Sequence, residues 1–265
     1  MLQRIVQAYY RLDGASPDGS LLVGGPGLSV DLWWLEGSAV TTVQAGGRPK
    51  VRRGAVVGGA LTRMLRVEKG RDAAGFGVSL APAAAAALFG VDASALADDF
   101  VDMDDALKAS APDLRDRVQE AKTHSEKARV VESVLSALLA KRGGADDRAS
   151  RIVSRITDSL RGATVESLAA ETGFTRRSLV NLVQRSLGIA PKELIQIMRF
   201  RRALRLMEGS SRPDWLTIAH ECGYADQSHL IRHCKRFTGL APGDFLARRL
   251  FPPLAHQVPR SGPVS

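Results

Sequence analysis

An internal repeat in the C-terminal part of the chain restricts its fold more than any other feature. The segments Val165–Leu194 and Trp215–Phe245 align with each other, and a glycine, an aromatic residue, a second glycine and a proline recur in the same order. The matched pairs are Gly173 with Gly223, Phe174 with Tyr224, Gly188 with Gly239, and Pro191 with Pro242. The offset grows by one residue at the turn, so the second turn holds one extra residue. Two copies of one supersecondary unit are therefore predicted.

Each copy has the pattern of two short helices joined by a tight turn. An apolar-periodic helix ends at Gly173 or Gly223, which can take the positive φ of a helix C-cap. Thr175 and Asp226 are favourable N-cap residues, and each is expected to begin a second helix. The expected elements are helix-turn-helix units at residues 165–187 and 215–238 and a joining helix at residues 192–208.

The second helix of each copy has one apolar face and one face of mostly long polar side chains. Such side chains can reach base edges and phosphates in a major groove. The candidate DNA-contacting residues are Arg176, Arg177, Val180, Asn181, Gln184, Gln227, Ser228, Ile231, Arg232 and Lys235. Two helices held on one side of a duplex would enter successive major grooves, about 34 Å apart. The alternative is a merely solvated helix face, but its occurrence in both copies favours DNA binding.

The positive charge of the chain is concentrated in the same region. Residues 1–150 carry 19 basic and 19 acidic side chains, whereas residues 151–250 carry 17 basic and 9 acidic ones. A basic segment beside a neutral one indicates a polyanion-binding module attached to a region with another role.

These features resemble the AraC/XylS-type transcriptional regulators, whose DNA-binding domain contains two helix-turn-helix units. The first-unit pattern S-x-R-x-L…G-x-x-P of that family corresponds here to Thr175, Arg177, Leu179, Gly188 and Pro191. The second-unit pattern corresponds to Gly223, Tyr224, Asp226, Ser228, Leu230, Arg232, Cys234 and Lys235, and the linker-helix pattern to Arg199 and Ala203. The chain departs from the family where Leu230 and Cys234 replace aromatic residues and where Asn181 replaces a basic one. The resemblance implies a sequence-specific transcriptional regulator, and we expect it to act as an activator.

The N-terminal part has a different organisation. Between residues 21 and 80, short apolar runs alternate with glycines, which predicts a small β-barrel or sandwich followed by helices. We expect an α+β regulatory domain at residues 1–143, an all-α DNA-binding domain at residues 144–250, with a linker at 141–150, and a disordered Pro-rich tail at residues 251–265. A long helix over residues 112–142 carries an apolar stripe, which either packs on the domain's own sheet or forms a dimer interface.

Two clusters of potential ligand residues have competing interpretations. His220, Cys222, His229, His233 and Cys234 could form a zinc site, but their positions within helices favour packing. The carboxylates between Asp98 and Asp105 could bind a cation or form a solvated helix face. We expect packing and solvation respectively, and therefore no metal and no cofactor.

Other function classes fit less well. An enzyme tethered to DNA would need a nucleophile–base pair or metal ligands in the N-terminal part, where His124 is the one histidine and cysteine is absent. Catalysis by carboxylates alone and an architectural DNA protein remain as alternatives. The uncharged stretch Ala73–Val91 contains glycines and a proline, so we expect no membrane span and a cytoplasmic protein. Besides double-stranded DNA, the candidate partners are RNA polymerase, a small-molecule effector and a second copy of the chain.

Overall fold

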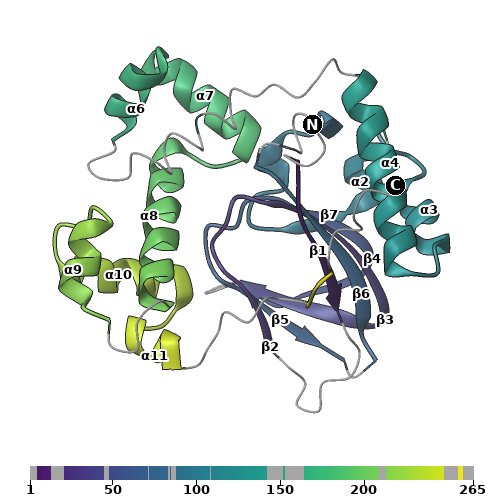
Figure 1. The fold of residues 1–265 in the computed structure, drawn as a ribbon, viewed down its shortest axis with the longest axis horizontal. Helices are drawn as coiled ribbons and strands as arrows, with labels where there is room; N and C mark the ends of the chain where they lie inside the picture. Colours follow the sequence, from purple (N-terminus) through teal and green to yellow (C-terminus); the bar gives the residue numbers. More distant parts are fainter. Residues whose placement is uncertain are drawn as a thin grey trace, which may run out of the picture.

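The computed structural model consists of one β-sheet with helices on both of its faces (Figure 1). It describes residues 5–12, 21–44, 48–70, 72–82, 84, 88–107, 109–141, 152, 164–208, 213–247 and 256–258. The strands are β1 Val6–Leu12, β2 Leu21–Gly24, β3 Val30–Gln44, β4 Lys50–Gly58, β5 Leu65–Lys69, β6 Ala74–Leu80, β7 Phe100–Asp102 and β8 His256–Val258. The helices are the short η2 Ala93–Ala95, then α2 Met103–Leu107, α3 Leu114–Glu120, α4 His124–Lys141, α6 Val165–Thr172, α7 Arg176–Leu187, α8 Pro191–Glu208, α9 Trp215–Glu221, α10 Gln227–Thr238 and α11 Pro242–Ala247.

The long strand β3 organises the sheet into a half-barrel. Its first half pairs with β6 and its second half with β5, while β4 pairs along the opposite edge. The pairings with β4 are interrupted between Leu35 and Val40, which is where β3 passes from one neighbour to the other. Every pairing among the described strands is antiparallel.

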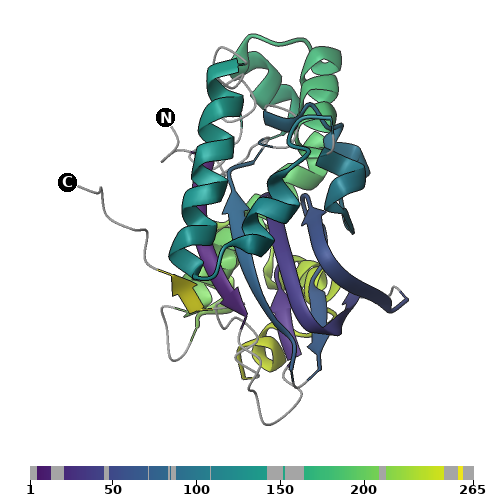
Figure 2. The same cartoon turned by 90° about the vertical axis from the view of Figure 1, so that its right-hand side faces the viewer.

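Helices α3 and α4 cover one face of this sheet, and the C-terminal helices lie on the other (Figure 2).

The prediction of a single long helix over residues 112–142 is wrong, because the helix is interrupted between Glu120 and His124, which gives α3 and α4. The predicted apolar stripe, including Val131, Leu135 and Leu138, is buried against the sheet in the domain's own core. The packing interpretation of the stripe is therefore confirmed.

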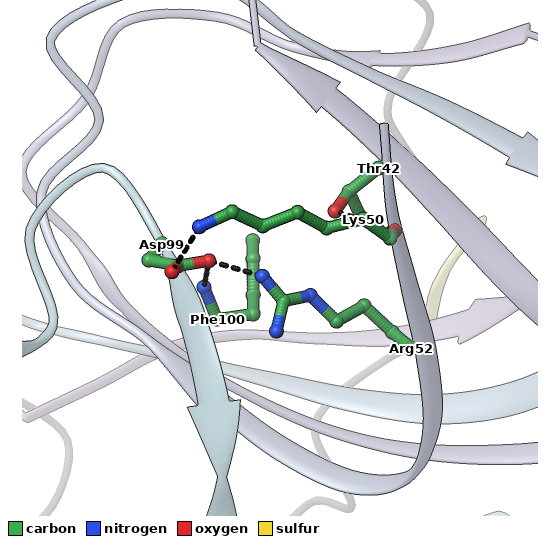
Figure 3. Close-up of polar contacts among 5 residues, drawn as sticks. All are labelled: Thr42, Lys50, Arg52, Asp99 and Phe100. Atoms are coloured by element: carbon green, nitrogen blue, oxygen red, sulfur yellow. Dashed lines mark hydrogen bonds and ion pairs between the residues drawn. The ribbon is translucent and has the colours of Figure 1, made fainter. Parts of the chain in front are cut away.

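Charged side chains of β4 form ion pairs with the segment before β7 (Figure 3). Lys50 and Arg52 of β4 converge on the Asp99 carboxylate, and the Lys50 Nζ lies 2.5 Å from it. Burial alone would raise the pKa of Asp99, but the bonds from Lys50 and the Phe100 N–H, together with the charge of Arg52, hold it below its usual range. The expectation of a solvated carboxylate face is thus wrong for Asp99, which is used in ion pairs within the domain.

The C-terminal tail also differs from expectation. Residues His256–Val258, predicted to be disordered, form β8 and pair with β1. The linker expected at 141–150 lies almost wholly outside the described residues. None of the described helices is both long and apolar enough to cross a lipid bilayer.

Candidate nucleic-acid interface

The first helix-turn-helix unit consists of α6 and α7, with the chain turning at Gly173. This glycine has φ 71°, and its N–H donates to carbonyls of α6, as a left-handed C-cap requires. Thr175 then caps α7, because its side-chain oxygen accepts a hydrogen bond of 3.1 Å from the Ser178 N–H. In the structure α6 begins at Val165 and α7 ends at Leu187, with Gly173 and Thr175 as the caps on either side of the turn.

The second unit, α9 and α10, repeats this geometry. Gly223 has φ 75°, and the Asp226 carboxylate caps α10 by accepting a hydrogen bond of 2.7 Å from the His229 N–H. The second helices of the two units, α7 and α10, are called the recognition helices below. They also end alike, since Gly188 and Gly239 have φ 75° and 78°. The repeat seen in the sequence is thus a repeat of backbone conformation.

Each recognition helix buries the predicted apolar face. Leu179 and Val183 of α7 and Leu230 and Cys234 of α10 all lie in one hydrophobic core with α8. Phe237 is also fully buried in this core, and its ring lies 4.9 Å from that of Phe200 on α8. Phe237 therefore supplies the aromatic packing that Leu230 and Cys234 do not.

The ten candidate DNA-contacting residues lie on the opposite faces of α7 and α10. Eight of them are exposed, and Val180 and Ile231 are half-buried at the margin of each face. Neither helix contains a carboxylate. Arg176 lies 3.5 Å from Glu166, but both side chains are mostly exposed, so this ion pair leaves the guanidinium available. The structure thus presents two basic, solvent-facing helix surfaces.

Arg236, one turn beyond Arg232, has a different role. Its guanidinium binds both carboxylate oxygens of Glu193 on α8, at 2.7 and 2.6 Å, and the Gln196 side chain at 2.7 Å. It also lies 5.3 Å from the centre of the Phe237 ring. This arginine fastens α10 to α8. This contact cannot be predicted from the sequence, because the partners of Arg236 are about forty residues away in the chain.

The histidines of α10 pack together with aromatic rings. His233 forms edge-on contacts with Tyr224 at 5.3 Å, His229 at 4.6 Å and Phe237 at 5.7 Å between ring centres. The two cysteines are buried, which raises the pKa of each thiol to about 11. Among the described residues, no three potential ligands are grouped to hold a metal ion. The geometry supports the packing interpretation of this cluster.

Comparisons with known proteins place these units among helix-turn-helix domains. Residues 168–248 match a family model described as a helix-turn-helix domain. No curated protein sequence matches the chain. Among solved structures, ToxT from Vibrio cholerae is 13% identical over 91% of this chain and 97% of its own, with a TM-score of 0.49.

Two smaller structures are similar to the C-terminal part of the chain. The DNA-binding domain of AdpA, solved in complex with a target DNA, is 28% identical over 39% of this chain and 97% of its own, with a TM-score of 0.36. A transcriptional regulator from Chromobacterium violaceum is 23% identical over 40% of this chain and 94% of its own, with a TM-score of 0.36.

Acid should weaken the second unit through His233. Burial, the neighbouring His229 and the charges of Arg236, Arg199 and Arg232 together lower the pKa of this histidine to about 4. The unfolded chain therefore binds the proton more readily, so the stability due to neutral His233 is present above about pH 6.5 and is lost as the pH falls towards 4. We expect a loss of about 1–3 kcal/mol over this range.

The measurement is the free energy of unfolding in urea, determined at pH 7 and pH 5 for the wild type and for His233→Gln. The glutamine side chain cannot be protonated. The free energy of unfolding should fall less between pH 7 and pH 5 in the variant than in the wild type. Equal pH dependence in both proteins would show that other groups are responsible.

Proposed function

We propose that this chain is an AraC-type DNA-binding transcriptional regulator that reads its operator with two recognition helices, α7 and α10. The match of residues 168–248 to a helix-turn-helix family model supports this proposal. The observation that carries this proposal is the pair of exposed, carboxylate-free helix faces on one shared core. Inserted into successive major grooves, they would contact two half-sites about one helical turn apart.

The residues proposed to contact DNA are the ten on these two faces. Arg177 and Arg232 are proposed as base readers, because an arginine can donate two parallel hydrogen bonds to guanine. The shorter side chains, such as Ser228, suit phosphate contacts at the entrance of a helix to the groove.

Binding should depend steeply on salt. Six or more phosphate contacts would give a slope of about −5 or steeper when log K is plotted against log salt concentration. The experiment is a binding selection with the purified full-length protein, followed by titration of the selected DNA between 50 and 200 mM salt, the range over which such a slope is readily measured. A folded protein that binds no DNA at low salt would contradict the proposed function.

Base reading by the two units can be separated by substitution. Arg177→Ala and Arg232→Ala should each remove about 1–3 kcal/mol of base discrimination, one at each half-site. The matched control is Arg129→Ala, which removes an exposed arginine from α4 on the far face of the sheet. Uniform weakening on all sequences by both variants would assign these arginines to phosphates instead.

We further propose that residues 1–143 regulate the DNA-binding part, residues 144–250. On the sheet face towards α8, Tyr10 and Trp33 stack at 6.1 Å between ring centres. Burial raises the pKa of the neighbouring Asp31, while Ser79, Ser29 and Arg201 of α8 oppose the rise. This arrangement brings a polar group of the sheet close to the linker helix, so a small-molecule effector at this face would act directly on α8.

Asp31→Asn should impair this regulation without changing the DNA interface. We expect the variant to bind the selected operator within about threefold of the wild type, since Asp31 lies on strand β3 and belongs to neither recognition face. Its operator-driven reporter should, however, respond less to growth conditions than that of the wild type. Asp105→Asn, at an exposed carboxylate of α2, is the control. An unchanged reporter response in Asp31→Asn would contradict the assignment of the regulatory face.

The remaining partners follow from this function. Activation would require contact with RNA polymerase, and a second copy of the chain could bind on a tandem or inverted site. A dimer would need a surface other than the α4 stripe, which is used inside the domain. We propose a cytoplasmic regulator without enzymatic activity or a cofactor, because its action on DNA needs neither.

A further inference from the structure

The equivalent glycines that end the two recognition helices have different surroundings. A Cβ atom at Gly188 would lie 2.3 Å from the Ala93 carbonyl oxygen and 3.0 Å from the Ala97 Cβ. At Gly239, which has nearly the same φ, a Cβ atom would meet nothing within 4 Å. Of these two glycines, therefore, only Gly188 lies directly against the N-terminal part of the chain.

The second unit contacts the N-terminal part at another place. The Met64 N–H donates a hydrogen bond of 2.7 Å to the Phe237 carbonyl oxygen near the end of α10. Met64 is buried in the same core as Phe237, together with Leu28 and Ala60. The connection between β4 and β5 thus holds the second recognition helix.

These two contacts belong to one hydrogen-bonded piece of the N-terminal part, residues 59–64 and 93–98, which we call the brace. The Gly59 N–H donates to the Leu96 carbonyl, and the Asp98 N–H donates to the Ala60 carbonyl, both at 2.9 Å. The Asp98 carboxylate accepts two hydrogen bonds of 2.6 Å from Thr62, one from its N–H and one from its hydroxyl.

Asp98 holds the brace in a costly backbone conformation. Its φ of 58° is the one positive value among the non-glycine residues that the structure describes. Such a conformation costs on the order of 1 kcal/mol or more and persists where surrounding contacts enforce it. Here the enforcing contacts are the bonds to Thr62 and Ala60, which join the two halves of the brace.

We propose that the brace sets the separation between the two recognition helices, and so the half-site spacing that the regulator accepts. This inference rests on the proposed function, in which both units bind one operator. The units lie towards opposite ends of α8 (Figure 1), and the brace joins them a second time, from Gly188 to Phe237. The two connections close a ring, so bending or twisting at α8 alone cannot change the separation.

The spacing of half-sites is a sensitive test of such a ring. Adding one base pair between them moves the second half-site by about 3.4 Å and rotates it by about 35°. A braced pair of helices cannot follow this change without breaking contacts. Units joined by α8 alone could adapt, since only one packed helix would need to yield.

The experiment compares Gly188→Ala with Gly239→Ala in the full-length chain. Both place a β-carbon at a positive φ, with a similar cost of about 1 kcal/mol. Only Gly188→Ala displaces the brace. Affinity is measured for the selected operator and for versions with one base pair added or removed between the half-sites, and folding is checked by thermal unfolding.

Each one-base-pair change should weaken the wild type and Gly239→Ala by about tenfold or more, as the loss of specific contacts in one half-site would. Gly188→Ala should lose about threefold or less for the same changes, because the freed unit can adjust. Thr62→Val removes one bond inside the brace without touching either unit, and should shift the spacing profile in the same direction. If Gly188→Ala does not fold, the spacing profile of Thr62→Val tests the proposal in its place.

A folded Gly188→Ala or Thr62→Val with the spacing profile of the wild type would overturn the inference. So would a wild-type protein that binds its operator with no preference for spacing, although the proposed function would then stand. A folded wild type that binds no DNA would instead overturn the proposed function and this inference with it.

Discussion

Burial of α8 is the constraint on which the arrangement of both helix-turn-helix units depends. Leu194, Ile197, Phe200, Ala203 and Met207 recur every three or four residues and are all fully buried. The adjoining Ile195, Met198 and Leu204 are buried as well, which widens the apolar surface beyond a single stripe. Rotating or sliding such a helix would expose apolar surface at about 25 cal/mol for each Å². The linker helix is therefore a structural core element rather than a tether.

The recognition helices show how a local sequence signal can determine a structure in detail. The side chains that cap α7 and α10 accept hydrogen bonds from N–H groups three residues away, and the glycines that end these helices take a positive φ. Both effects act within one helical turn. Because the signals are local and occur twice, the limits of both units and their exposed faces could be predicted from the sequence alone.

Contacts between distant segments could not be predicted in this way. Arg236 has the same sequence context as a DNA-reading arginine, yet Glu193 binds it from another helix. Asp99 lies in a run of carboxylates that reads as a solvated surface, but Lys50 and Arg52 arrive from a strand that precedes it by nearly fifty residues. The sequences around Ala93 and Gly188 give no sign that these two residues pack against each other. These contacts arise from the topology of the sheet, which hydrophobic periodicity does not specify.

The pairing of β8 with β1 has a consequence for how the protein is made. β8 follows the DNA-binding domain in the chain, yet it completes the sheet edge formed by Tyr9, Tyr10 and Arg11. During synthesis the N-terminal segments emerge first, and that strand edge stays open until the ribosome has passed His256. The Met64 N–H likewise gains its hydrogen-bond acceptor, the Phe237 carbonyl oxygen, only after α10 has been synthesised. The half of the protein that is translated first thus reaches its final state only after the half that it is proposed to control.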